Sequence, residues 1–335
     1  MDRSTGILYI ADFNGNRIRK LTPDGMISTH AGDGVDDFVN GPASTARFRS
    51  PRGVAVDSAG IVYVSDYGNH CIRKVADNTV STLAGVCGTS GFNDGSGSSA
   101  LFNNPAGLTL DKSGSLFVAG HSDGRIRKIV ISSRVVSTFA GGSTMGYTNG
   151  QGTTAGFNYP YDVAFNSSGY LFVADKDNHM IRVISPSGYV SLFAGSSSGL
   201  LDGQGAAAMF DTPAALAFDD NGNLYVAEYH NPVIRKVSPS GFVKSLTNSR
   251  GLFGDQSGPA LKSTFWHPTG IEVDGNGTIY VADDYSNKIK IICNMTCING
   301  VADCFGNRCK CDNGWTGANC GILIPTSSKK QDCNL

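Results

Sequence analysis

Residues 66–75 read DYGNHCIRKV and place an acid, a histidine, a cysteine and two cations within ten residues. Carboxylate, imidazole and thiol groups at such short spacing are the ligands of a metal site or the parts of a catalytic centre. The same kinds of residue recur as DFNGNRIRKL at 12–21, DKDNHMIRVI at 175–184 and EYHNPVIRKV at 228–237. Because a repeat array fixes the fold, this recurrence must be explained before any chemistry is assigned.

Each of six such segments follows a short apolar run of strand type. The runs are spaced by 54, 54, 55, 53 and 55 residues, and they begin at Leu8, Val62, Leu116, Leu171, Leu224 and Ile279. Every complete unit holds four candidate strands, separated by turns rich in glycine and Asx residues that suit hairpin connections. Four antiparallel strands repeated around a ring predict an all-β, six-bladed β-propeller over residues 1–292.

A longer segment between the blades carries a second repeat. It contains a phenylalanine at a fixed register, at Phe48, Phe102, Phe157, Phe210 and Phe265. A proline follows three residues later each time, at Pro51, Pro105, Pro160, Pro213 and Pro268. We expect the phenylalanine to anchor a long loop to the core, and the proline to lead into the next inner strand.

The combined pattern P-x-G-[VI]-x-V-D, a strand ending in A-D, and then N-H-x-I-R resembles the NHL-repeat family. The resemblance covers residues 1 to 292, recurs in phase six times, and implies an NHL-type six-bladed propeller. The sequence departs from the pattern at Gly120, which replaces a strand-end acid, and at Ala214 and Ala215, which replace an inner glycine. The Asn-His pair survives only at residues 69–70 and 178–179.

The repeated charged residues are interpreted as scaffolding, with no metal or catalytic site among them. The strand-end acids are expected to cap the turn that follows them, at Asp12, Asp66, Asp175, Glu228 and Asp283. A ring of carboxylates holding a cation is the alternative, but equivalent turns on neighbouring blades diverge around the ring. The repeated arginines are expected to pair with acids between blades, at Arg19, Arg73, Arg127, Arg182 and Arg235.

The repeat is incomplete where blades one and six meet. Met1-Asp2 aligns with Val56-Asp57, at the end of an inner strand, and blade six passes from NKIKII into Cys293 without a fourth strand. We expect roughly 30–50 further residues before Met1 by the repeat arithmetic. We also expect another polypeptide segment in the gap, because bare strand edges invite pairing.

Six of the nine cysteines lie in residues 293–320, with the spacing C-x3-C-x6-C-x4-C-x-C-x8-C. This segment resembles an EGF-like module, and residues 321–335 form a polar tail. The resemblance implies the disulfides Cys293–Cys304, Cys297–Cys309 and Cys311–Cys320. A zinc knuckle is the competing interpretation, but the segment has no histidine and no C-x2-C pair. KIKII precedes the first cysteine where calcium-binding modules carry acids, so no calcium is expected.

The remaining cysteines are Cys71, Cys87 and Cys333. Cys71 opens the third strand of blade two and Cys87 follows the fourth, so their positions predict a disulfide. Cys333 is left over, which suggests a partner in another chain or in further sequence.

This number of expected disulfides indicates an oxidising compartment, so the protein is expected to be secreted or at the cell surface. N-glycosylation sequons at Asn166, Asn276 and Asn294 agree, and N-linked glycans are the only non-protein groups expected.

The balance of 27 basic and 28 acidic residues gives no attraction for nucleic acid. No apolar run approaches 18 residues, so no membrane span is expected.

The leading hypothesis is a non-catalytic extracellular interaction, structural or adhesion protein, with the propeller as a rigid platform for protein partners or self-assembly. Its expected binding face carries aromatics that depart from the repeat: Phe92, Tyr147, Tyr159, Tyr161, Tyr229, Trp266 and Tyr285.

An enzyme is the alternative. Propellers related to this family include a zinc-dependent amidating lyase and calcium-dependent lactonases, which hold a metal at the mouth of the central channel. The matching positions here offer only Asp162, with His267 as a second candidate ligand, and that set is too poor for a metal site. A subunit of an extracellular filament or wall is a third hypothesis.

Overall fold

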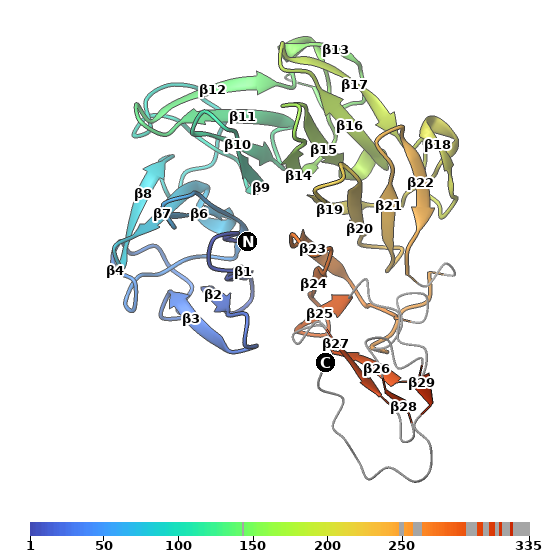
Figure 1. The fold of residues 1–335 in the computed structure, drawn as a ribbon. Coiled ribbons are helices and arrows are strands. Elements are labelled where there is room, and N and C mark those ends of the chain that lie inside the picture. The colour runs from blue at the N-terminus through green and yellow to red at the C-terminus, as the bar shows by residue number, and fades with distance from the viewer. Residues whose placement is uncertain are drawn as a thin grey trace.

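The computed structural model describes residues 1–142, 144–247, 251–256 and 263–292 with their side chains, and four short strands beyond them by backbone alone. Its core is six antiparallel sheets arranged around a common axis (Figure 1). Blades one and two contain β1 (Leu8–Asp12), β2 (Arg17–Leu21), β3 (Ile27–Ala31), β5 (Pro51–Val56), β6 (Val62–Asp66), β7 (Cys71–Ala76) and β8 (Thr79–Ala84). Blades three and four contain β9 (Pro105–Leu110), β10 (Ser115–Gly120), β11 (Arg125–Val130), β12 (Val135–Ala140), β14 (Pro160–Phe165), β15 (Leu171–Asp175), β16 (Met180–Ile184) and β17 (Tyr189–Ala194).

Blades five and six complete the ring. They contain β19 (Pro213–Phe218), β20 (Leu224–Glu228), β21 (Ile234–Val237), β22 (Phe242–Ser245), β23 (Pro268–Val273), β24 (Ile279–Asp283) and β25 (Lys288–Ile292). Short elements between blades are β4 (Gly41–Pro42), β13 (Gly150–Gln151), β18 (Gly203–Gln204), η1 (Tyr67–Asn69), η2 (Gly152–Thr154), η3 (Lys176–Asn178) and η4 (Gly205–Ala207). Two further strand pairs follow, β26 (Gly300–Asp303) with β27 (Arg308–Cys311), and β28 (Trp315–Thr316) with β29 (Ile322–Leu323).

The core consists of apolar clusters between successive blades. The cluster between blades four and five, for example, joins Phe172 and Ile181 of one sheet to Leu216 and Val226 of the next. All five anchor phenylalanines of the inter-blade segments are fully buried. The expectation that they fix long loops to the core is therefore confirmed.

The strand-end acids contradict the expectation that they cap the following turn. Asp66 accepts hydrogen bonds from the backbone N–H of Arg49 at 2.8 Å, the amide of Asn69 at 3.0 Å and Nη1 of Arg73 at 2.7 Å. The same contacts recur at Asp175 with Asn158, Asn178 and Arg182, and at Glu228 with Asp211, Asn231 and Arg235. A buried carboxylate is stabilised by hydrogen bonds from the donors around it. For these acids, one donor is a backbone N–H group of the loop that precedes their blade. Among the strand-end acids, only Asp12 accepts a backbone N–H of the turn that follows it, that of Gly15 at 3.1 Å.

Three of the repeated arginines, Arg73, Arg182 and Arg235, bind both that acid and the preceding inter-blade loop. Arg73 donates to the carbonyl oxygens of Arg47 and Val39 at 3.1 and 3.0 Å, and to Oδ1 of Asn40 at 2.7 Å. The equivalent contacts repeat at the same sequence separations around Arg127, Arg182 and Arg235. The sequence predicted that these arginines pair with acids between blades. In the structure, most of the acceptors of each arginine lie in the loop that precedes its blade or within that blade itself.

Blade two carries a disulfide between Cys71 and Cys87, with Cα atoms 5.1 Å apart. Cys71 is fully buried at the start of β7, and Cys87 lies just beyond the end of β8. The proposed disulfides Cys293–Cys304, Cys297–Cys309 and Cys311–Cys320, the leftover Cys333 and the sequon at Asn294 lie outside the residues whose side chains are described.

The first and sixth sheets have three strands each. β1 pairs with β2 alone, and β25 pairs with β24 alone among the described strands. Among the strands that the structure describes, no inner strand lies beside β1 in blade one and no outer strand lies beside β25 in blade six.

Candidate functional site

The two Asn-His pairs that opened the question of chemistry have a structural role. His70 and His179 each adopt a left-handed backbone conformation at the end of a short 3-10 turn. Nδ1 of His70 accepts the backbone N–H of Asn104 at 3.1 Å, and Nδ1 of His179 accepts that of Thr212 at 3.2 Å. Each imidazole therefore holds the segment that enters the next blade. Among the described residues, no group of three His, Cys, Asp or Glu side chains is placed to hold a metal ion.

An arginine surrounded by aromatic rings lies at one end of the central channel. The guanidinium carbon of Arg52 is 4.9 Å from the ring centre of Phe13, and 4.5 Å from those of Tyr67 and Tyr161. The three rings come from blades one, two and four. Stacking on rings uses the faces of a guanidinium and leaves its N–H groups available. Sequence reasoning missed this cluster, because it forms only when three distant blades meet.

His121 of blade three packs into the same cluster. Its ring centre lies 5.8 Å from Tyr67, 5.0 Å from Tyr159 and 5.5 Å from Tyr161. Burial lowers the pKa of His121 to about 3, and the positive charge of Arg52 acts in the same direction. The imidazole is therefore neutral at physiological pH, which makes it a packing and hydrogen-bonding group.

Tyr161 does not fit the expectation of an exposed aromatic on the binding face. Its side chain is buried, because Arg52 and His121 cover the ring. Burial also raises the pKa of Tyr161 to about 12, so its hydroxyl keeps its proton. Tyr159 beside it is half-buried.

A second aromatic cluster belongs to blades five and six. The imidazole of His267 stacks on Tyr229, with ring centres 4.4 Å apart and planes 12° from parallel. Tyr285 meets His267 edge-on at 5.5 Å and lies 5.7 Å from Trp266. Trp266 is 38% exposed and Tyr285 is 69% exposed. In this cluster the stacked rings of Tyr229 and His267 are half-buried, and the rings of Trp266 and Tyr285 are exposed.

The last two expected aromatics lie on the inter-blade loops before blades three and four. Phe92 is 54% exposed, and the guanidinium of Arg125 lies 4.3 Å from its ring centre. Tyr147 is 68% exposed. Four of the seven expected residues, Phe92, Tyr147, Trp266 and Tyr285, are therefore open to solvent.

Asp162 lies inside the channel, at a cavity of about 180 Å³ that is also lined by Gly107, Ala215 and Glu272. Its carboxylate accepts the backbone N–H groups of Val163 at 2.9 Å and Leu216 at 2.8 Å. Burial raises the pKa of Asp162 to about 7, and the nearby Glu272 adds to the effect. His267 does not line this cavity, so the structure does not bring together the two residues that sequence reasoning considered as ligands.

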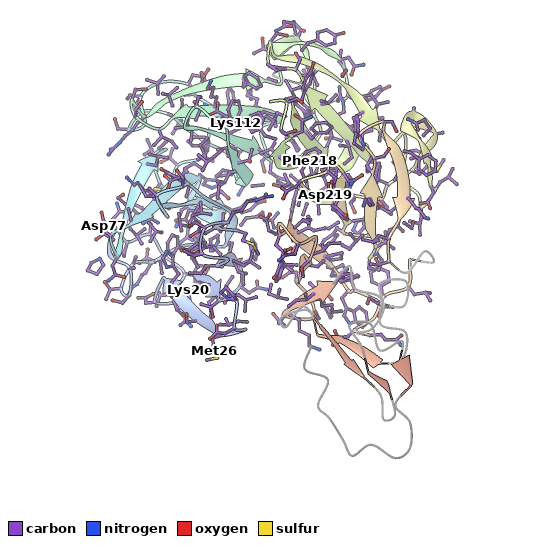
Figure 2. All side chains as sticks on the ribbon, viewed as in Figure 1. Lys20, Met26, Asp77, Lys112, Phe218 and Asp219 are labelled. Atoms are coloured by element: carbon purple, nitrogen blue, oxygen red, sulfur yellow. A yellow bond between two sulfur atoms is a disulfide. The ribbon has the colours of Figure 1, made fainter. Side chains whose placement is uncertain are left out.

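A larger cavity, of about 580 Å³, lies among the turns between first and second strands. Lys112, Phe218 and Asp219 line it, and Figure 2 labels all three. Nζ of Lys112 donates to the carbonyl oxygen of Ser167 at 2.9 Å, and Asp219 accepts hydrogen bonds within its own turn. Lys112 thus joins two neighbouring turns, and Asp219 stabilises its own turn.

A sequence model of the NHL repeat matches residues 48–75, which run from the anchor phenylalanine of blade two into its third strand. The chain is an all-β, six-bladed β-propeller with an NHL repeat. In sequence it is similar to human NHL repeat-containing protein 2, with 30% identity over 333 residues that cover 87% of this chain and 45% of the relative. It is also 25% identical to teneurin-4 of Mus musculus over 336 residues, covering 86% of this chain and 12% of the relative.

The chain therefore spans about half the length of the NHL repeat-containing relative and a much smaller part of the teneurin. Two solved propellers share its fold. A catalytically inactive virginiamycin B lyase from Staphylococcus aureus aligns with a TM-score of 0.52 at 14% identity, covering 86% of this chain and 78% of that one. A gluconolactonase from Xanthomonas campestris aligns with a TM-score of 0.56 at 13% identity, covering 83% and 79%. Among the described residues, no helix has the length and apolar character needed to cross a membrane.

Proposed function

We propose that this chain is an extracellular interaction or structural protein, in which the propeller is a rigid, non-catalytic platform for protein partners. The observation that carries the proposal is the aromatic cluster of Tyr229, His267, Trp266 and Tyr285. Tryptophan and tyrosine held in place by neighbours lose little conformational freedom when they bind, which suits them as interface anchors. The aromatic loops around the channel mouth extend the same face.

An extracellular location is supported by the disulfide between Cys71 and Cys87 and by the cysteine-rich segment at 293–320. The sequon asparagines Asn166 and Asn276 lie in turns that join first and second strands, and Asn276 is exposed. A role within a larger chain or an extracellular assembly is consistent with the longer relatives, of which this chain matches only part.

A secreted propeller enzyme of the lyase or lactonase type is the second candidate, favoured by the half-buried Asp162 at the channel cavity. A lone carboxylate with a raised pKa can act as a proton donor or acceptor at neutral pH. Measurement of bound zinc and calcium on pure protein decides between the two. One metal ion per chain would favour the enzyme.

Binding to intact, non-permeabilised cells and matrix of the source organism tests the proposal. Labelled wild-type chain is compared with Trp266→Ala/Tyr285→Ala and with a matched control, Tyr189→Ala/Phe242→Ala. The control rings are also exposed, on the outer strands β17 and β22. We expect saturable binding that the first pair abolishes and the control retains. Absence of binding, or equal loss in both variants, would contradict the proposal.

A further inference from the structure

Arg52 and Tyr161 occupy the same position of the repeat, directly after the proline that opens an inner strand. At that position β9, β19 and β23 carry the smaller residues Ala106, Ala214 and Thr269. Among the five inner strands that the structure describes, only blades two and four therefore place a long side chain at this level of the channel. Both side chains line the channel cavity of about 180 Å³. Such a departure from the repeat indicates a contact that the scaffold itself does not need.

The guanidinium of Arg52 is held by aromatic rings but has no counter-charge. Its carbon lies 4.5 Å from the ring centres of Tyr67 and Tyr161 and 4.9 Å from that of Phe13. Within the described part of the chain, this side chain donates no hydrogen bond and forms no ion pair. The four fully buried repeat arginines, by contrast, each bind an acid. Arg52 is thus a half-buried, oriented cation whose N–H groups are available to a ligand.

The surroundings of His121 show that the electrostatic potential at this place is positive. Burial lowers the pKa of this imidazole to about 3, and the charges of Arg52 and Lys176 both add to the effect. Nζ of Lys176 lies 5.5 Å from the ring centre of Tyr161, so one ring contacts both cations. Lys176 also approaches Oδ1 of Asp177 at 3.4 Å, but that partner is exposed and its charge is well screened. An anion bound beside the two cations would relieve their mutual repulsion.

Two acids lie near this cluster, and neither forms an ion pair with Arg52. The carboxylate of Asp162 accepts the backbone N–H groups of Val163 and Leu216. Asp284 is exposed after β24, and its charge acts on Tyr161. The cation therefore remains open to an anion from outside, whose binding Asp284 would oppose.

We propose that Arg52 is the anchor of a binding site for a carboxylate, supplied by an aspartate or glutamate side chain of the protein partner. The planar guanidinium offers parallel N–H groups that match the two oxygens of a carboxylate. The rings orient the guanidinium in advance, so little conformational freedom is lost on binding. Tyr161 also lies within electrostatic reach of Tyr229, which places the acid beside the second aromatic cluster. The inference rests on the proposed function, because it names the charge that the partner brings to the same face.

The test compares two labelled peptides that differ only in the carboxylate, one of alternating glutamate and glycine and one of alternating glutamine and glycine. Fluorescence anisotropy with the 335-residue chain at low ionic strength measures their binding. We expect the glutamate peptide to bind saturably and about tenfold more tightly, because only it can form charge-assisted hydrogen bonds with Arg52. Equal or absent binding of the two peptides would overturn the proposal, and this comparison does not depend on any variant folding.

Variants locate the site. Arg52→Gln should weaken binding of the glutamate peptide about tenfold. Arg52→Lys should fall between this variant and the wild type, because an ammonium keeps the charge and loses the planar fork. Lys244→Gln is the matched control, since it removes one exposed cation from β22 and should change binding less than about twofold. Asp284→Asn should tighten binding by removing an opposing charge. Equal losses in Arg52→Gln and Lys244→Gln, or weaker binding in Asp284→Asn, would contradict the assignment.

Two further comparisons separate this site from its alternatives. At equal ionic strength, acetate should displace the glutamate peptide at lower concentration than inorganic sulfate or phosphate does. The reverse order would show a site for a tetrahedral oxyanion and would overturn the carboxylate.

Trp266→Ala/Tyr285→Ala should leave peptide binding unchanged while it abolishes binding to cells. Cell binding that survives Arg52→Gln, together with equal binding of the two peptides, would defeat the carboxylate site alone. Absence of saturable cell binding by the wild type would instead defeat the proposed function.

Discussion

Nη1 of Arg182 lies 3.0 Å from Oδ2 of Asp175, which is seven residues earlier on the neighbouring strand. Both side chains are buried. Blades two and five contain the same pair as Arg73 with Asp66 and Arg235 with Glu228, each at 2.7 Å. In all three blades the guanidinium also binds the loop that enters the blade. The pair therefore joins two strands to the segment that connects one blade to the next.

Removal of one partner from this pair should be severely destabilising. Arg182→Leu leaves the buried Asp175 carboxylate without its cation, and we expect a loss of about 3–5 kcal/mol in the free energy of unfolding. The double variant Asp175→Asn/Arg182→Leu should lose less than the single one. Urea denaturation followed by tryptophan fluorescence measures both.

The control for that experiment is Arg49→Ala, because Arg49 and Asp36 form an ion pair whose side chains are 47% and 60% exposed. A surface pair of this kind contributes about 0–1 kcal/mol. Similar losses for Arg182→Leu and Arg49→Ala would show that the buried network does not stabilise the blades.

The disulfide between Cys71 and Cys87 should stabilise the fold by closing a loop with a sequence separation of 16 residues. A loop of that length corresponds to about 3 kcal/mol in the chain-entropy description. Cys71→Ala/Cys87→Ala should lower the free energy of unfolding by that amount under oxidising conditions. Under reducing conditions the wild type should approach the variant. An unchanged midpoint in both comparisons would argue against a stabilising bridge.

Asp162 should make stability depend on pH in a defined direction. Its pKa is about 7 in the folded protein and near 3.8 when exposed, so between these values the native state alone binds the proton. Stability from this group is then present at low pH and falls as pH rises toward 7, by at most about 1.4 kcal/mol per pH unit. Asp162→Asn should remove this slope. Parallel slopes for both proteins between pH 4 and 7 would contradict a raised pKa for Asp162.

Asn276 is the exposed sequon asparagine in the turn between β23 and β24. Expression through a secretory pathway should add a glycan there, because the site is accessible at the tip of a hairpin. Glycosidase treatment should reduce the mass of the wild-type chain and change it less in Asn276→Gln. An unmodified Asn276 in protein secreted by eukaryotic cells would remove one support for an extracellular location.

The repeat period was enough to predict six blades and the buried phenylalanines. Those features depend on local pattern and spacing, which a single sequence displays. The direction in which Asp66 and Asp175 bind was predicted wrongly, because their partner N–H groups lie 17 residues earlier and no local propensity points to them. Arg52 was missed, and Tyr161 was wrongly expected to be exposed, since their cluster is assembled from rings on separate blades.

The most direct test of the platform hypothesis is photo-crosslinking from the aromatic cluster. A photoreactive benzoylphenylalanine replaces Tyr285 in one protein and Tyr189, which is 50% exposed on β17, in another. After irradiation on intact cells or matrix, the hypothesis predicts saturable adducts from position 285 that unlabelled wild type competes away, and none from position 189. Equal adducts from both positions, or none from position 285, would contradict it.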